Sequence, residues 1–179
     1  MKLIHDLLKH YDGETMRFAL MSAHYRQPLD WTEALLNQSK ATLDRLYNAL
    51  RRMKDADADD ADAPVGLVAA LCDDLNTPLA LAELSALATE ANKSEPGDWP
   101  RLKGQMLAAG ALLGLLQRDP DDWARGDATD AQRIDALVQQ RIDARKAKDF
   151  AAADQIRKAL AAEGIEIMDG PSGSTWRRI

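Results

Sequence analysis

The side chains best suited to chemistry lie in the last part of the chain. They are two arginines, two aspartates, a phenylalanine and a tryptophan: Arg145, Phe150, Asp154, Arg157, Asp169 and Trp176. Guanidinium groups hydrogen-bond to unpaired bases or stack on them, aromatic rings stack on them, and carboxylates accept hydrogen bonds from their exocyclic amines. These residue types indicate single-stranded RNA as a ligand. Two alternatives stay open: Phe150 can belong to a hydrophobic core, and Arg145 with Asp154 can form an ordinary salt bridge.

The rest of the chain has no pattern typical of a catalytic or metal centre. It contains no glycine-rich phosphate loop and no GxSxG nucleophile motif. The histidines, His5, His10 and His24, do not have the i, i+4 spacing that presents two metal ligands on one helical face, and Cys72 is the only cysteine. We therefore predict no catalytic residue, no metal ligand and no cofactor for this chain.

Charge is distributed unevenly along the 179 residues. The formal net charge of -6 argues against a nucleic-acid partner for the chain as a whole. However, five aspartates fall within residues 55–62, whereas residues 131–179 have nine Lys/Arg against seven Asp/Glu, a balance of +2. A membrane-spanning helix needs about 18 consecutive apolar residues, and no apolar run in this sequence approaches that length. We expect a cytoplasmic protein with no membrane partner.

Two helices and a hairpin are expected to position the candidate side chains. Thr129 with Gln132 has the form of a capping box, and the helix that follows should end near residues 146–148. Asp149 predicts the N-cap of the second helix, which should stop at Gly164. Its inward stripe should be Phe150, Ala153, Ile156 and Leu160. Residues 165–178 then alternate in hydropathy around a turn, which predicts two strands, with Trp176 anchoring the hairpin.

The first two thirds of the chain predict a helical bundle. Its longest helix should begin at a capping box of Asp30 and Glu33 and end near Met53. The aspartate run at 55–62 predicts a solvated connection. Two helices should follow, the first opened by Pro64 and burying Val65, Val68 and Leu71, the second capped by Thr77. The fold class is mainly α: an antiparallel helical bundle followed by a small α+β domain of two helices and a β-hairpin.

Several stretches in order resemble the C-terminal half of bacterial-type cysteinyl-tRNA synthetases. They are SAHYRQPL, LDRLYNAL, DDLNTPLAL and the ending that runs from AADQIRKAL to GSTWRR. The resemblance covers essentially the whole chain. It implies a helical stem-contact region at 1–28, a DALR-type helical bundle at 29–118, a linker at 119–129 and an anticodon-binding domain at 130–179.

The resemblance also implies a ligand and the residues that contact it. The partner is cysteine tRNA, bound at its GCA anticodon and at its inner corner. The family's anticodon contacts fall on Arg145, Phe150, Asp154, Arg157 and Asp169, the same residues that the chemistry selects.

The departures from the family concern catalysis. The HIGH-type and KMSKS-type ATP-binding motifs and the zinc ligands are missing. We therefore expect a monomeric fragment that is no enzyme by itself and whose second partner is the missing catalytic domain, with ATP and zinc used only by the parent enzyme. One alternative is a free-standing tRNA-binding or protein-interaction module. Another is the related ligase of mycothiol synthesis, a family that lacks the anticodon unit.

Overall fold

The computed structural model describes residues 4–8, 10–126, 128–170 and 173–178, and only the backbone of residues 128–132, 177 and 178. The chain forms two compact units, Met1–Pro120 and Asp121–Ile179. Helices dominate both units, and the strands within the described ranges form one two-stranded sheet near the C-terminus. The predicted mainly α fold is therefore confirmed. None of the helices in the described part of the chain combines the length and hydropathy needed to span a bilayer.

The first unit is a bundle of helices. Its elements are α1 (Ile4–Leu7), α2 (Gly13–Met21), α3 (Glu33–Arg52), α4 (Val65–Cys72), α5 (Thr77–Lys93), the 3-10 turn η1 (Pro96–Asp98) and α6 (Trp99–Leu113). Leu43, Leu46 and Leu50 of α3 are buried, with Leu84 of α5 and Met106 of α6. The apolar residues that recur at helical spacing along α3 thus form its buried face.

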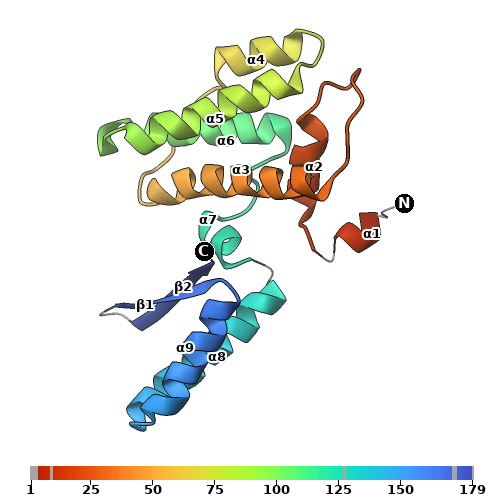
Figure 1. Cartoon of the computed structure of the whole chain (residues 1–179). Helices are drawn as coiled ribbons and strands as arrows, with labels where there is room; N and C mark the ends of the chain where they lie inside the picture. The colour runs from red at the N-terminus through yellow and green to blue at the C-terminus, as the bar shows by residue number, and fades with distance from the viewer. Residues whose placement is uncertain (1–3, 9, 127, 171–172, 179) are drawn as a thin grey trace. The chain divides into compact units, whose positions relative to one another are not determined.

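The bundle is not antiparallel throughout, because α3 and α5 run in the same direction. Arg52 at the end of α3 donates to the carbonyl oxygens of Asn92 and Ser94 at the end of α5. Its guanidinium also lies 5.6 Å from the ring centre of Trp99, which opens α6. The chain reverses direction through α4 before α5 begins, so the pair α3 and α5 is parallel, as Figure 1 shows.

Two predicted N-caps are wrong by one or two residues. The cap of α3 is Thr32, whose hydroxyl accepts from the Leu35 amide at 3.1 Å, and not Asp30. The cap of α5 is Asn76, which accepts from the Leu79 amide at 3.2 Å, so Thr77 is already helical. Asp, Asn and Thr all cap well, so neighbouring candidates compete and the packing of the chain decides between them.

The predicted buried face of α4 is also wrong. Leu67 and Ala70 are buried, whereas Val65 and Val68 are exposed and Leu71 is only half-buried. This short helix packs mainly against α5. The eight residues of α4 are almost all apolar. The sequence therefore shows no difference in hydropathy between the faces of this helix and does not indicate which face is buried.

The aspartate run has solvated side chains but an anchored backbone. The five aspartates of residues 55–62 are exposed. The backbone of this run is held by α6. The Asp59 amide donates to the Pro100 carbonyl at 3.0 Å, and Lys103 Nζ donates to the Ala56 carbonyl at 2.6 Å. Gly104 of α6 allows this approach, because a Cβ there would overlap the carbonyl oxygen of Asp59.

A polar network fixes the end of the first unit. Glu14 accepts hydrogen bonds from the hydroxyl of Tyr47 at 2.8 Å and from the Leu116 amide, and the same hydroxyl accepts from the Arg118 amide at 3.2 Å. Burial raises the pKa of both the Glu14 carboxyl and the Tyr47 hydroxyl. The segment after α6 is therefore tied back to α2 and α3 by side chains and not by secondary structure.

The second unit contains α7 (Pro120–Arg125), α8 (Ala128–Lys146), α9 (Phe150–Ala162), β1 (Ile165–Gly170) and β2 (Gly173–Arg178). Its core joins both long helices to the hairpin through Ile134, Val138, Leu160, Ile165 and Trp176. The strands pair antiparallel with Ile167 opposite Trp176 and Asp169 opposite Ser174. Residues 119–129 were expected to be a linker, yet they include the helix α7. The predicted capping box of Thr129 and Gln132 involves side chains outside the described residues.

Candidate nucleic-acid interface

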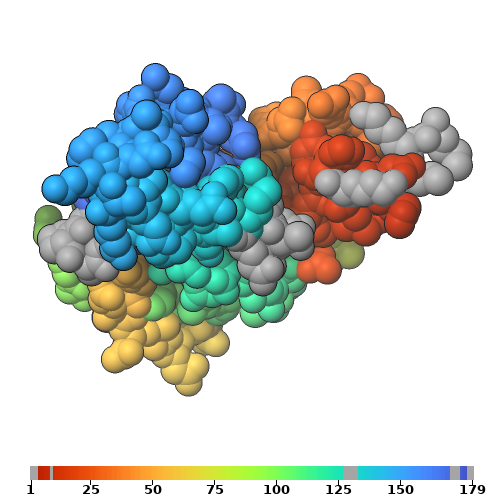
Figure 2. All heavy atoms as spheres, turned by 90° about the horizontal axis from the view of Figure 1, so that it is seen from below, coloured from red at the N-terminus to blue at the C-terminus, as the bar shows by residue number. Residues whose placement is uncertain are grey.

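The candidate site lies on the helical hairpin of α8 and α9 and on the strand that follows. The two helices pack along their lengths, as the cyan and blue atoms of Figure 2 show. Arg133 near the start of α8 pairs with Glu163 at the end of α9, which fixes their antiparallel order. Asp149 caps α9 by accepting from the Ala152 amide at 3.0 Å, as the sequence predicts.

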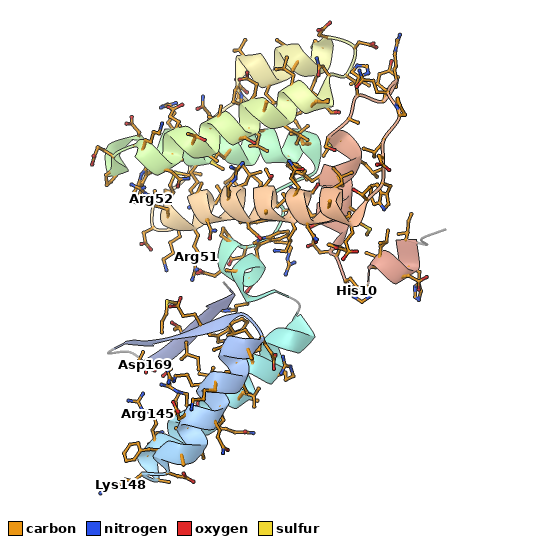
Figure 3. All side chains as sticks on the ribbon, viewed as in Figure 1. His10, Arg51, Arg52, Arg145, Lys148 and Asp169 are labelled. Atoms are coloured by element: carbon orange, nitrogen blue, oxygen red, sulfur yellow. The ribbon has the colours of Figure 1, made fainter. Side chains whose placement is uncertain are left out.

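Asp169 is the centre of a polar cluster that joins α8 to the β-hairpin. Arg141 of α8 donates from both Nη atoms to the two carboxylate oxygens, each at 2.9 Å. Arg145, one helical turn later, donates to Oδ2 at 3.0 Å, and Ser174 on β2 donates to Oδ1 at 2.6 Å. The structure therefore brings together Arg145 and Asp169, which are 24 residues apart in the sequence. Both lie along one edge of the unit together with Lys148 (Figure 3).

The contact between Asp169 and Arg141 favours the charged form of both residues. Hydrogen bonds from Arg141 and Ser174 hold the pKa of the Asp169 carboxyl well below its usual range. The same carboxylate raises the pKa of the Arg141 guanidinium. Asp169 and Arg141 consequently remain an ionised pair across the physiological pH range.

Asp154 and Arg157 form a second ion-paired group on α9. Arg157 donates from Nε and Nη2 to Oδ1 of Asp154, at 3.1 and 2.7 Å. Lys158 Nζ lies 3.1 Å from the other carboxylate oxygen. The hydrogen bonds from Arg157 and Lys158 lower the pKa of the Asp154 carboxyl. The alternative salt bridge of Arg145 with Asp154 is therefore not formed, because each residue pairs elsewhere.

Phe150 is exposed and not part of the core. It is the first residue of α9 and remains 66% exposed, so its predicted inward position is wrong. Ala153 and Leu160 on the expected stripe are buried, but the stripe begins one turn after Phe150. Trp176 takes the structural role predicted for it: it is buried, and its indole nitrogen donates to Asp135 at 2.6 Å.

The sequence pattern did not identify Arg141 and Ser174 as partners of Asp169. A signal for Arg141 existed, because it continues the spacing of Ile134 and Val138 on the buried face of α8. An arginine on such a stripe needs a buried or half-buried acceptor. Ser174 could be found only from the strand register, which places it directly opposite Asp169.

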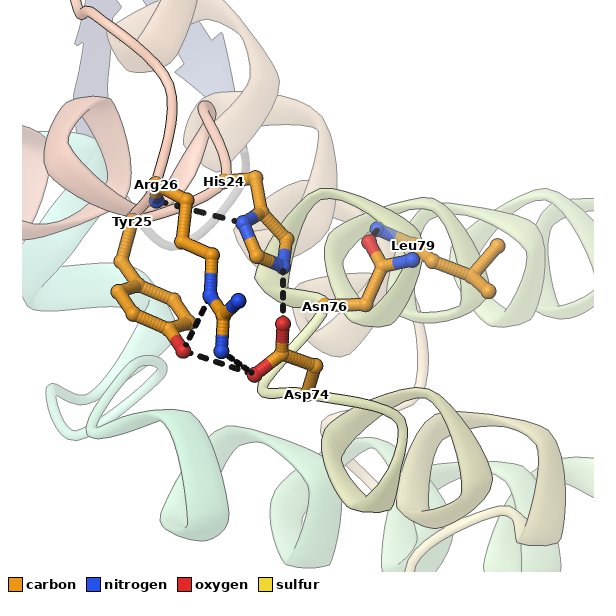
Figure 4. A network of polar contacts seen from close by, with 6 residues as sticks. All are labelled: His24, Tyr25, Arg26, Asp74, Asn76 and Leu79. Atoms are coloured by element: carbon orange, nitrogen blue, oxygen red, sulfur yellow. Dashed lines mark hydrogen bonds and ion pairs between the residues drawn. The ribbon is translucent and has the colours of Figure 1, made fainter.

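A third polar cluster lies in the first unit, between the loop after α2 and the turn before α5 (Figure 4). Asp74 accepts from the hydroxyl of Tyr25 at 2.7 Å and from Arg26 Nη2 at 3.1 Å, and His24 Nε2 lies 3.9 Å from its other oxygen. The rings of His24 and Tyr25 stack at 4.9 Å, and the Arg26 guanidinium lies 5.3 Å from the Tyr25 ring centre. Asp74 reaches this loop from a turn in which it and Leu75 both have positive φ. The cluster thus presents an arginine and an aromatic ring to solvent in a fixed arrangement.

Metal-binding geometry does not occur among the side chains that the structure describes. No group of three or more His, Cys, Asp or Glu residues there comes close enough to hold an ion. Cys72 is exposed and free.

Three family models match the chain. The model described as the cysteinyl-tRNA ligase anticodon binding domain matches residues 129–177, which contain the clusters of Asp169 and Asp154. The DALR domain matches residues 67–117. The class I (C) tRNA synthetase catalytic domain matches residues 1–41, which cover the segment expected to be the stem-contact region and reach into α3.

Curated relatives match the chain over nearly its full length. They include cysteine–tRNA ligases of Hyphomonas neptunium, 58% identical over 181 residues, Caulobacter vibrioides, 52% over 180, and Xanthomonas campestris, 53% over 178. These alignments cover 97 to 98% of this chain. The chain spans 39% of the length of each of these relatives.

Proposed function

We propose that the chain corresponds to the C-terminal part of a cysteinyl-tRNA synthetase, that it binds cysteine tRNA and that it reads the GCA anticodon through its second unit. The residues assigned to this reading are Arg145, Phe150, Asp154, Arg157 and Asp169. Anticodon contacts far from the reacting atoms increase specificity by adding binding energy for the correct tRNA.

One observation carries the proposal: all five assigned side chains are accessible on one small domain. Their exposed fractions lie between 43 and 66%. A core phenylalanine or a buried structural ion pair would not be available to an RNA base. The exposed ring of Phe150 suits stacking, and the exposed arginine–aspartate pairs suit hydrogen bonds to base edges.

We assign aminoacylation itself to the part of the ligase that lies beyond this chain, together with its ATP and zinc. The match to the catalytic domain is limited to residues 1–41, which supports this assignment. Within this proposal, the chain supplies recognition and the remainder supplies chemistry.

The Arg157→Ala variant tests the reading of the anticodon. The full chain is titrated with transcribed cysteine tRNA and with tRNAs altered at each anticodon base, at two salt concentrations. Loss of one bidentate base contact costs roughly 1–3 kcal/mol, so binding to the GCA-bearing tRNA should weaken roughly 5- to 160-fold. The preference for the GCA anticodon over an altered anticodon should decrease as well.

Lys158→Ala is the matched control, because this neighbouring cation also contacts Asp154. It should weaken binding to every tRNA by the same factor, and this factor should be smaller than the one for Arg157→Ala. Discrimination between anticodons should stay unchanged. If Arg157→Ala behaves as the lysine variant does, Arg157 contacts phosphate and not a base. If the unaltered chain binds all anticodons equally, this part of the ligase does not read the anticodon by itself.

We also propose that the cluster around Asp74 contacts the inner corner of the tRNA. Arg26 is exposed, and Tyr25 and Asp74 hold its guanidinium in place (Figure 4), which suits a phosphate contact. Arg26→Ala should weaken binding to the whole tRNA by about 1 kcal/mol, roughly fivefold, and leave binding to an isolated anticodon hairpin unchanged. The control is Arg101→Ala, which removes another exposed, ion-paired arginine of the same unit. Equal losses for Arg26→Ala and Arg101→Ala, or a loss for the hairpin, would contradict an inner-corner contact.

A further inference from the structure

The carboxylate of Asp169 has no acceptor position left for an incoming base. An ionised carboxylate offers about four lone-pair positions. Arg141 occupies one on each oxygen, Arg145 occupies a second on Oδ2 and Ser174 a second on Oδ1. Direct contact between Asp169 and an amino group of RNA therefore requires one of these donors to leave.

Arg141 and Arg145 differ sharply in how easily they can leave. The side chain of Arg141 is only 9% exposed and lies on the face of α8 that packs against the hairpin. Separating it from Asp169 would leave a buried guanidinium without its acceptor, which is costly. The side chain of Arg145 is 50% exposed, and an exposed ion pair contributes little to stability because water replaces the partner.

We propose that Arg141 is a positioning residue of the anticodon-reading site and that Arg145 is the exchangeable partner of Asp169. This inference rests on the proposed function. When RNA binds, Arg145 moves from Oδ2 of Asp169 to the RNA, and an amino hydrogen of a base takes the vacated position. Arg141 and Ser174 keep the carboxylate in place during this exchange of hydrogen bonds.

The bidentate geometry gives Arg141 a role that charge alone does not supply. Two parallel N–H groups at 2.9 Å fix both the position and the plane of the carboxylate. A lysine ammonium at the same place would keep the charge but leave the carboxylate free to rotate. The direction in which Asp169 presents the lone pair that Arg145 vacates, and with it the choice of base, therefore depends on the guanidinium of Arg141.

The test measures discrimination between RNA hairpins by the full chain. The probes are a hairpin carrying the GCA anticodon and three hairpins altered at one anticodon base each. Arg141→Lys should reduce discrimination at one anticodon position roughly tenfold and leave the other two positions unchanged. Asp169→Asn should reduce discrimination at the same position, and combining the two substitutions should add little further loss.

Two further variants keep the outcome interpretable. Ser174→Ala removes a donor to Asp169 without leaving a buried charge, and it should cause a smaller loss at the same position even if Arg141→Lys folds poorly. Lys146→Ala changes an exposed cation beside Arg145 and should weaken binding to all hairpins by the same factor. A purely structural Arg141 would lower the unfolding temperature or the affinity for all hairpins and leave every discrimination ratio unchanged.

The exchange itself is followed by nuclear magnetic resonance of the arginine side chains in the unaltered chain. Adding the GCA hairpin should shift the guanidinium signals of Arg145 and leave the hydrogen-bonded signals of Arg141 in place. Loss of the Arg141 signals with retention of those of Arg145 would overturn the inference. Intact discrimination in both Arg141→Lys and Ser174→Ala would also overturn it. Absence of anticodon discrimination by the unaltered chain would instead overturn the proposed function, and this inference with it.

Discussion

Replacement of Trp176 by alanine is expected to unfold the second unit while the first unit stays folded. The indole is buried among Ile134, Val138 and Leu160 and donates a hydrogen bond to Asp135. Truncating such a side chain costs about 3–5 kcal/mol. A unit of about 60 residues has a total stability of roughly 3–9 kcal/mol, so the loss removes most of it.

Amide hydrogen exchange measures both units of the Trp176→Ala variant in one experiment. Protection should disappear from α8, α9 and the strands and persist in α3 and α5. Trp176→Phe is the matched control: it retains most of the buried area, loses only the bond to Asp135 and should cost about 1 kcal/mol. Retained protection of the strands in Trp176→Ala would show that Trp176 does not anchor the hairpin. Loss of protection in both units would show that they do not fold independently.

Gly104→Ala is expected to destabilise the first unit by about 1–3 kcal/mol, the cost of forcing extra volume into a packed position. In most helices the same change stabilises by roughly 1 kcal/mol, because alanine has the higher helix propensity. The sign reverses here because the new methyl group would overlap the Asp59 carbonyl, and backbone cannot rotate away as a flexible side chain can. Denaturant unfolding of the full chain, followed by circular dichroism, measures the change.

Gly13→Ala provides the control for Gly104→Ala. Gly13 is also helical, but a Cβ there meets no atom within 4 Å. Its replacement should leave stability unchanged or slightly increased. If Gly104→Ala is as stable as Gly13→Ala, the backbone of residues 55–62 is not docked on α6 and behaves as the solvated connection that its composition predicts.

Functional residue types could be selected from the sequence, but not their partners. Arg145 and Asp169 follow from chemistry and from the resemblance, whereas their mutual contact depends on the packing of the β-hairpin against α8 and α9. The position of Arg141 on the buried stripe of α8 indicates that it needs an acceptor, but the sequence does not indicate which residue supplies it. The sequence predicts an inward position for Phe150, because it continues the apolar periodicity of α9. The buried residues of α9 begin only one turn later, at Ala153.

The sequence by itself determined the helices, the hairpin and most of the buried stripes of α3, α8 and α9. These features depend on interactions between residues a few positions apart, such as the capping of α9 by Asp149 and the apolar spacing along α3. Tertiary structure alone decided the parallel order of α3 and α5, the inward face of α4, the docking of residues 55–62 on Gly104 and the four donors to Asp169. Each of these depends on contacts between different elements, and such contacts are fixed only when whole elements pack.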